Sequence, residues 1–145
     1  MTETPITRDE FKRRITALCL GGVGPGLPRK ERDRHILLKS VSLALGHGRE
    51  YTEPSLNAAL ERWLAAAGPA VRIDHVSLRR YLVDEAYVVR DAAGRSYRVR
   101  PSGEWSSIFE RGVDDIDVLG AVRAAVAERK ERRGRRRTQG TRQPD

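Results

Sequence analysis

The sequence contains a single cysteine, Cys19, which excludes an internal disulfide and a zinc site built from several cysteines. Its position near the apolar face of a helix favours a small buried side chain over a reactive thiol. No run of about 18 apolar residues is present, so no membrane-spanning helix is expected. The first five residues are neither basic nor apolar, unlike a secretory signal. Together these absences predict a soluble, cytoplasmic domain.

Catalytic and metal-binding motifs are also scarce. The three histidines, His35, His47 and His75, are scattered, and none belongs to a ligand motif such as HExxH. The glycine-rich stretch at residues 21–28 lacks the Gly-Lys-Ser/Thr ending of a phosphate-binding loop, so we interpret it as a linker. The acids at residues 114–117 are explained by the start of a helix. We therefore expect no enzyme activity, no catalytic residue, no metal, no cofactor and no small-molecule ligand.

Arginine, by contrast, is abundant. The 145 residues are 39% hydrophobic and 33% charged, which suits one domain with a hydrophobic core. The formal net charge is +8, and the last 18 residues hold eight basic and three acidic side chains, a net of +5. Arginine outnumbers lysine 24 to 4, a bias that G- and C-rich genomes also produce. The positive charge is therefore concentrated near the C-terminus, and the rest of the chain is mildly basic.

Two helices are predicted on either side of the linker. Thr7 and Glu10 have the spacing of a capping box, in which each side chain binds an amide at the helix start. The apolar face of this first helix would consist of Phe11, Ile15 and Leu18. The second helix covers about residues 30–45. Its buried face is predicted to be Ile36, Leu37, Val41, Ala44 and Leu45.

The central part of the chain predicts a short extended segment at residues 49–52, a helix from 52 or 53 to about 68, and a helix at 75–85 capped by Asp74. Strands at 87–90 and 95–100 flank a turn and form a hairpin. This order is typical of a winged helix. We predict an α+β, mostly helical fold with a winged-helix-like core of three helices plus a β-hairpin, and an added N-terminal helix and C-terminal helix.

Beyond the hairpin, the apolar residues Trp105, Ile108 and Phe109 are expected to fold back onto the core. A last helix should start near residues 114–117. From about residue 130 no apolar stripe remains, and residues 132–145 are predicted to be a disordered basic tail. The chain is thus divided into an N-terminal helix and linker (1–26), a winged-helix-like domain (27–101), a C-terminal extension and helix (102–131) and the tail (132–145).

Three stretches resemble a known bacterial family, domain of unknown function 2087. They are LPRKERDRHILL at residues 27–38, GREYTEPSLN at 48–57 and IDHVSLRRYLVDEAYVVRD at 73–91. The resemblance implies a winged-helix-like module that in some members is fused to helix-turn-helix regulators, and the family has no established chemistry. One departure is Ala86, where the family pattern implies glycine. Alanine would be strained there if the position requires a positive φ.

A DNA-binding winged helix places the helix before the hairpin in the major groove, and its wing contacts the backbone. That helix would offer His75, Ser77, Arg79 and Arg80 to bases, since arginine pairs bidentately with guanine. Arg95, Arg98 and Arg100 of the wing would meet phosphates. The tail arginines would add affinity without sequence preference, and they are Arg132, Arg133, Arg135, Arg136 and Arg137. Duplex DNA is therefore the first predicted partner.

Other interpretations remain open. Helix 75–85 with its cap has a formal charge of −1, and Arg79 and Arg80 have the spacing to pair with Asp84 or Glu85. The tail can also be read as a solvated run of charge. The alternative function is a protein-interaction module, because a winged helix also packs on protein partners. The apolar faces of the two outer helices would then complete the core or form a homodimer.

Overall fold

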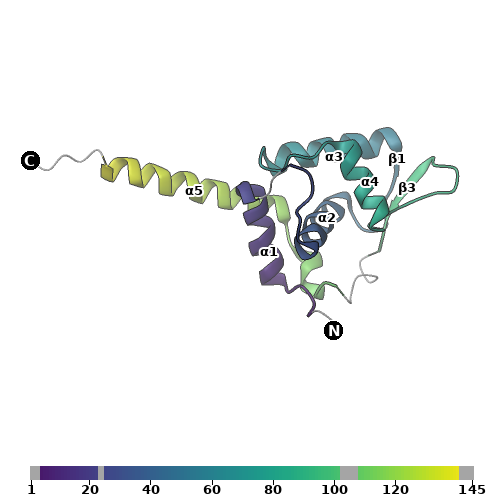
Figure 1. Ribbon diagram of the computed structural model, residues 1–145, viewed down its shortest axis with the longest axis horizontal. Coiled ribbons are helices and arrows are strands. Elements are labelled where there is room, and N and C mark those ends of the chain that lie inside the picture. Colours follow the sequence, from purple (N-terminus) through teal and green to yellow (C-terminus); the bar gives the residue numbers. More distant parts are fainter. Residues whose placement is uncertain (1–3, 23–24, 102–107, 141–145) are drawn as a thin grey trace, which may run out of the picture.

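The computed structural model describes residues 4–22, 25–101 and 108–140, with side chains for residues 4–21, 25–101 and 108–136. Helices dominate, and one small antiparallel sheet lies at one end of the molecule (Figure 1). The α+β, mostly helical class is therefore confirmed. No helix within the described part of the chain combines the length and the apolar character that crossing a membrane requires.

The central region has the predicted order of helix, strand, helix, helix and hairpin. Its sheet has the strand order β1-β3-β2, so the first strand pairs with the second strand of the hairpin. Tyr51 lies opposite Tyr97, and Val88 lies opposite Val99. The six elements are α2 (Glu31–Leu45), β1 (Glu50–Thr52), α3 (Glu53–Ala67), α4 (His75–Asp84), β2 (Val88–Arg90) and β3 (Ser96–Val99).

Local capping explains where these helices begin and end. Thr52 caps α3 in a reciprocal capping box with Ser55, and the Asp74 carboxylate accepts the amide of Ser77 at the start of α4. At the end of α4, Ala86 has φ 64°. The next amide, that of Tyr87, donates to the Leu82 carbonyl at 2.8 Å, as in a Schellman ending. The position therefore requires a positive φ although it is occupied by alanine.

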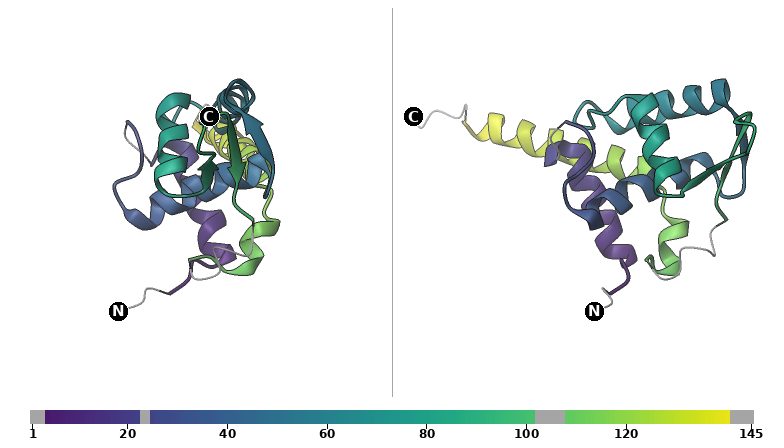
Figure 2. Two further views of the ribbon diagram at one scale, coloured as in Figure 1. Left: turned by 90° about the vertical axis from the view of Figure 1, so that its right-hand side faces the viewer. Right: turned by 45° about the vertical axis from the view of Figure 1, so that its right-hand side comes forward.

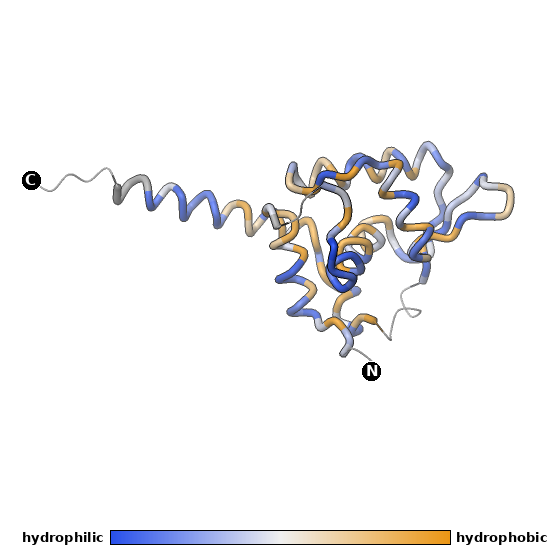
Figure 3. The backbone as a smooth tube through the Cα atoms, viewed as in Figure 1, coloured by the Kyte–Doolittle hydropathy of each residue, from blue (hydrophilic) through white to orange (hydrophobic). Residues whose placement is uncertain are grey.

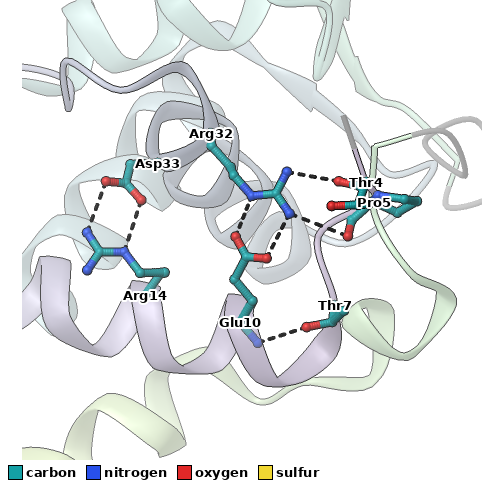
Figure 4. Close-up of polar contacts among 7 residues, drawn as sticks. All are labelled: Thr4, Pro5, Thr7, Glu10, Arg14, Arg32 and Asp33. Carbon is teal, nitrogen blue, oxygen red and sulfur yellow. Dashed lines mark hydrogen bonds and ion pairs between the residues drawn. The ribbon is translucent and has the colours of Figure 1, made fainter. Parts of the chain in front are cut away.

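Helix α1 (Arg8–Ala17) continues into a π-helical turn, η1 (Leu18–Gly22), and packs on α2. Thr7 caps it by accepting the amide of Glu10, but the second half of the predicted capping box is absent. The Glu10 carboxylate instead forms an ion pair with Arg32, whose guanidinium also donates to the carbonyls of Thr4 and Pro5 (Figure 4). An ion pair with a neighbouring helix thus replaces the local contact.

A second ion pair holds the same two helices together. Arg14 of α1 makes two hydrogen bonds, of 3.0 and 3.1 Å, to the carboxylate of Asp33 on α2 (Figure 4). The guanidinium is bidentate, a geometry that adds specificity as well as energy. Donating these hydrogen bonds to the Asp33 carboxylate also raises the pKa of Arg14. The added N-terminal helix is therefore fixed to the central region by two charge pairs as well as by its apolar face.

The buried surface of α2 is wider than predicted. Ile36, Leu37, Val41 and Leu45 are buried as expected, but Ala44 is exposed. Further side chains that the one-face pattern missed are buried, namely Leu38, Lys39, Ser40 and Ser42. Helix α2 contacts α1, α3 and α5, so neighbours surround it on several sides. A helix enclosed in this way does not follow a single-stripe pattern.

The C-terminal extension folds back as expected. Phe109 is buried, Ile108 is partly buried, and Trp105 lies outside the described residues. Ile6 exchanges backbone hydrogen bonds with this segment, which joins the stretch before α1 to residues 108–110. A short 3-10 helix, η3 (Arg111–Asp115), then leads into α5 (Val118–Gly140), whose first turn is capped by Asp117.

Helix α5 differs from the sequence prediction at its end. The sequence predicts a disordered tail over residues 132–145, whereas α5 continues to Gly140 and projects away from the body of the molecule (Figure 1). Residues 141–145 lie outside the described residues. Glu128 pairs with Arg132 at 2.6 Å and Glu131 with Arg135 at 3.7 Å, both at the i,i+4 spacing that supports a helix. Arginine and glutamate are also good helix formers. We refer to residues 128–140 as the α5 arm.

Candidate nucleic-acid interface

Helix α4 and the β2–β3 hairpin lie side by side at the end of the molecule opposite the α5 arm (Figures 1 and 2). A groove of about 290 Å³ runs between them, and we call it the α4–hairpin groove. Its lining residues are Glu53, Val76, Arg79, Arg80, Val83, Asp84, Arg90 and Tyr97. Three arginines and two acids therefore share this groove, which gives it a formal charge of +1.

Tyr97 of β3 lines the groove and contacts two of its arginines. Its ring is buried, and the guanidinium carbons of Arg79 and Arg90 both lie 5.9 Å from the ring centroid. Cation–π attraction to the ring helps to hold both arginines beside it. Since Arg79 comes from α4 and Arg90 from β2, this contact sets the spacing between the helix and the hairpin.

Arg79 is used inside the domain and does not project from it. Its guanidinium donates to Asn57 at 2.6 Å and pairs with Glu53 at 3.0 Å, and its side chain is only 18% exposed. Both partners belong to α3. Arg79 therefore does not form the pairing with Asp84 or Glu85 along α4 that the sequence left open as an alternative. Its acidic partner is Glu53 on the neighbouring helix α3, and the spacing of residues within α4 cannot reveal a partner on another helix.

Arg80, in contrast, is exposed on α4. Its guanidinium lies 5.6 Å from the ring of Tyr81, and it forms no ion pair with Asp84 or any other acid among the described residues. The adjacent Val76 is 50% exposed, so this face of α4 is open to solvent. Of the four helix candidates, Arg80 is the one best placed to reach a partner.

The other two candidates on α4 serve the helix start. Ser77 donates its hydroxyl to Asp74 at 2.8 Å while its amide binds the same carboxylate at 2.7 Å. These hydrogen bonds lower the pKa of Asp74. His75 lies 3.3 Å from Glu61 of α3 and is partly buried. Both side chains are therefore occupied by neighbours within the domain.

The candidates on the hairpin and just after it differ from one another in exposure. Arg95 is exposed at the turn, where its amide donates to Asp91 at 2.7 Å and helps to lower the pKa of that carboxyl. Arg98 is exposed on the outer face of the sheet, 3.8 Å from Glu50. Arg100 is half-buried, and its carbonyl lies 3.2 Å from Nδ1 of His47. Arg95 and Arg98 are thus accessible, while Arg100 belongs to the edge of the core.

Arg90 was not among the predicted residues, although it lines the groove and is exposed. Gly94 in the turn has φ 69°, and a Cβ placed on it would lie 2.5 Å from Nη2 of Arg90. The turn glycine therefore leaves the space that Arg90 occupies. The cross-strand pairing of Arg90 with Tyr97 could have revealed this arginine, had the register of the hairpin been known.

The tail candidates are not brought together with the groove. Arg132 and Arg135 pair with acids of the α5 arm, Arg133 and Arg136 are exposed, and Arg137 lies in the helix with its side chain outside the described part. The arm is hydrophilic along most of its length and points away from the hairpin (Figure 3). The arm and the groove are therefore two separate basic surfaces.

Two buried polar contacts lie elsewhere in the molecule. The fully buried Nζ of Lys39 lies 2.9 Å from Oδ1 of Asp114, and Nε2 of His47 lies 3.5 Å from the same oxygen. Nδ1 of His35 lies 2.7 Å from the hydroxyl of Tyr87, whose pKa is raised by burial. Over the residues that the structure describes, no group of three or more His, Cys, Asp or Glu side chains could hold a metal ion.

The fold and the groove define a small α+β domain in which a helix and a hairpin project together. Residues 26–99 match the model of a family described as an uncharacterized protein conserved in bacteria, DUF2087. Because this match covers half of the chain, the chain belongs to that family, as the resemblance indicated. No curated protein and no solved structure matches this chain.

Proposed function

We propose that this chain is a winged-helix module that binds duplex DNA in a transcription-regulator-like role and does not catalyse a reaction. In this proposal α4 is the recognition helix and the β2–β3 hairpin is the wing. The observation that carries it is the exposure of Arg80 and Arg90 on opposite sides of the α4–hairpin groove. The strand order β1-β3-β2 supports the same assignment, since the first strand completes the sheet behind the wing.

The positions of the arginines favour phosphate contacts over base contacts. Arg95 and Arg98 are exposed on the wing, while Arg79, Ser77 and His75 are bound within the domain. Arg80 is then the main candidate to reach a base edge. We therefore expect strongly salt-dependent binding with modest sequence preference, because phosphate contacts carry no sequence information directly.

The α5 arm would add to binding independently of the groove. Residues 128–137 contain seven basic and two acidic side chains, and the arm extends from the opposite end of the molecule (Figure 1). Its arginines would neutralise further phosphates without reading sequence. A cytoplasmic location, where chromosomal DNA of bacteria is accessible, is part of this proposal.

The test is the binding of the full chain to random duplex DNA over a series of salt concentrations. The logarithm of the binding constant should fall with the logarithm of salt by about 0.9 for each phosphate contacted. A full-length variant with Arg132, Arg133, Arg135 and Arg136 changed to Gln should bind more weakly and with a smaller slope, but it should still bind. Loss of all binding in this variant would leave no role for the α4–hairpin groove.

A protein-interaction module is the alternative, and the groove itself gives a reason for it. Glu53 and Asp84 line the groove beside the arginines, and Val76 and Val89 are 50% and 46% exposed. A mixed surface with exposed apolar side chains also suits a protein partner or a second copy of this chain. A dimeric mass in sedimentation equilibrium that becomes monomeric in a Val76→Glu variant would favour this alternative.

A further inference from the structure

A second hollow lies at the root of the α5 arm, far from the α4–hairpin groove. It has a volume of about 580 Å³ and is bounded by η1, the end of α3 with the turn that follows, and α5. Its apolar lining includes Cys19, Leu20, Ala66, Val122 and Val126. This volume falls within the range of small-molecule sites, about 300–1,000 Å³. We call it the arm-root pocket.

The rim of the arm-root pocket is entirely cationic. Its charged lining residues are Arg123, Arg129, Lys130 and Arg133, all of them exposed, and no acid lines it. Arg129 already bends over the pocket, because its Nη1 donates to the carbonyl of Leu20 at 2.9 Å. Arginine has five N–H donors, so a single bond to Leu20 leaves several for a ligand.

The acids of the arm lie away from this pocket. Val122, Val126, Arg129 and Arg133 follow one another at spacings of four, three and four residues, which places them on one face of α5. Glu128 and Glu131 line no part of the pocket and pair with Arg132 and Arg135 instead. One face of α5 therefore passes from apolar near the body to purely cationic along the arm.

We infer that the arm-root pocket binds a free single-chain amphiphilic anion, with its apolar chain among Cys19, Ala66 and Val126 and its charged group against the cationic rim. The apolar lining suits an unbranched hydrocarbon chain, and guanidinium groups bind carboxylate or phosphate oxygens in the bidentate manner. A ligand without a chain would not use the lining, and one without a negative charge would not use the rim. This inference does not depend on DNA binding.

The first test is calorimetric titration of the full chain with hexanoate, octanoate and decanoate, each below the concentration at which it forms micelles. Each added methylene should lower Kd by about fourfold while the chain fills the pocket. One molecule should bind per protein chain. Decyltrimethylammonium has the same chain with a positive head group, and it should bind at least tenfold more weakly.

Substitutions inside and outside the arm-root pocket test whether decanoate binds there. Ala66 lines the pocket and is exposed, so Ala66→Phe should fill the pocket without disturbing the core and should weaken decanoate binding at least tenfold. Ala65→Phe is the matched control, because Ala65 is also exposed on α3 but does not line the pocket. Arg133→Gln should weaken binding about two- to fivefold, as expected for an exposed ion pair. Arg135→Gln, on the same arm but outside the pocket, should leave it unchanged.

Cys19 gives a second readout, since it is the sole cysteine and lines the pocket. Saturating decanoate should slow its reaction with a disulfide reagent, and decyltrimethylammonium should not. The inference is overturned if decanoate fails to bind, if the two decyl compounds bind alike, or if Ala65→Phe and Ala66→Phe have equal effects. Capture of the chain by phosphatidylglycerol vesicles without decanoate binding would also overturn it, since the surface would then bind membranes.

Discussion

The guanidinium of Arg79 on α4 lies 3.0 Å from the carboxylate of Glu53 in the first turn of α3. Together with the hydrogen bond from Arg79 to Asn57, this pair fixes α4 against α3 and turns Arg79 away from solvent. Its neighbour Arg80 lies on the same helix and carries the same charge, but its side chain is exposed. Two adjacent arginines therefore have different roles, one positioning the helix and the other available to a partner.

This difference predicts that the two arginines contribute unequally to stability. Arg79→Met should lower the free energy of unfolding by about 1–2 kcal/mol, because it removes a charged hydrogen bond and an ion pair whose guanidinium is largely buried. Arg80→Met should change it by less than about 0.5 kcal/mol, as is usual for an exposed side chain. Urea denaturation followed by far-UV circular dichroism measures both. Equal effects of the two variants would contradict the assigned roles.

The ion pair of Lys39 and Asp114 predicts that removing the acid destabilises the domain more than removing the lysine. Asp114→Ala leaves the fully buried ammonium without its carboxylate and should cost about 2–4 kcal/mol. Lys39→Met leaves only the partly exposed acid and should cost much less, since an apolar side chain of similar size suits that site. The double variant should be more stable than Asp114→Ala alone. Additive losses in this double-mutant cycle would show that the two residues do not interact.

The strained backbone at Ala86 predicts a stabilising substitution. Its φ of 64° is costly for alanine and easy for glycine, and the position ends α4. Ala86→Gly should therefore raise the free energy of unfolding by about 0.5–1 kcal/mol despite the added freedom of the unfolded chain. Ala92→Gly, in the exposed turn of the hairpin, is the control and should not stabilise the domain. A loss of stability in Ala86→Gly would contradict the observed conformation.

The ion pair between Glu10 of α1 and Arg32 of α2 predicts that the free energy of unfolding falls at acidic pH. Hydrogen bonding from Arg32 lowers the pKa of Glu10 below its ordinary value of 4.5. A lowered folded-state pKa means that the stabilisation is complete above about pH 4.5 and is lost as the pH falls through the folded-state value. The urea midpoint of Glu10→Gln should therefore change less between pH 6 and pH 3 than that of the natural chain. Asp9→Asn, an exposed neighbour, should keep the natural pH dependence.

Much of the fold could be predicted because its signals are local. The caps at Thr7 and Asp74 and the turn between the two strands of the hairpin each depend on residues close in the sequence. The predictions of burial that failed depended on distant contacts. The burial of Lys39 reflects Asp114, which is far away in the chain. The helical arm has a different cause: it carries no apolar stripe, and local charge pairs and helix propensity stabilise it instead.

The candidate interface was predicted less well for a related reason. Sequence periodicity placed Arg79 and Arg80 on α4, but it could not show that Glu53 and Asn57 of another helix hold only the first of them. Similarly, Arg90 became a candidate only when the register placed it opposite Tyr97. Which arginine is accessible depends on tertiary packing, and a single sequence gives little information about that.

The central claim is that the α4–hairpin groove binds duplex DNA, and Arg80 tests it most directly. The measurement is the Kd for a duplex of random sequence at a fixed salt concentration. The background is the full chain with Arg132, Arg133, Arg135 and Arg136 changed to Gln, so that the α5 arm contributes little. Arg80→Glu should weaken binding about tenfold or more, because it reverses a charge at the proposed contact. Arg111→Glu, the same change on exposed η3, should have a small effect. Equal weakening by both variants would contradict the groove as the DNA-binding surface.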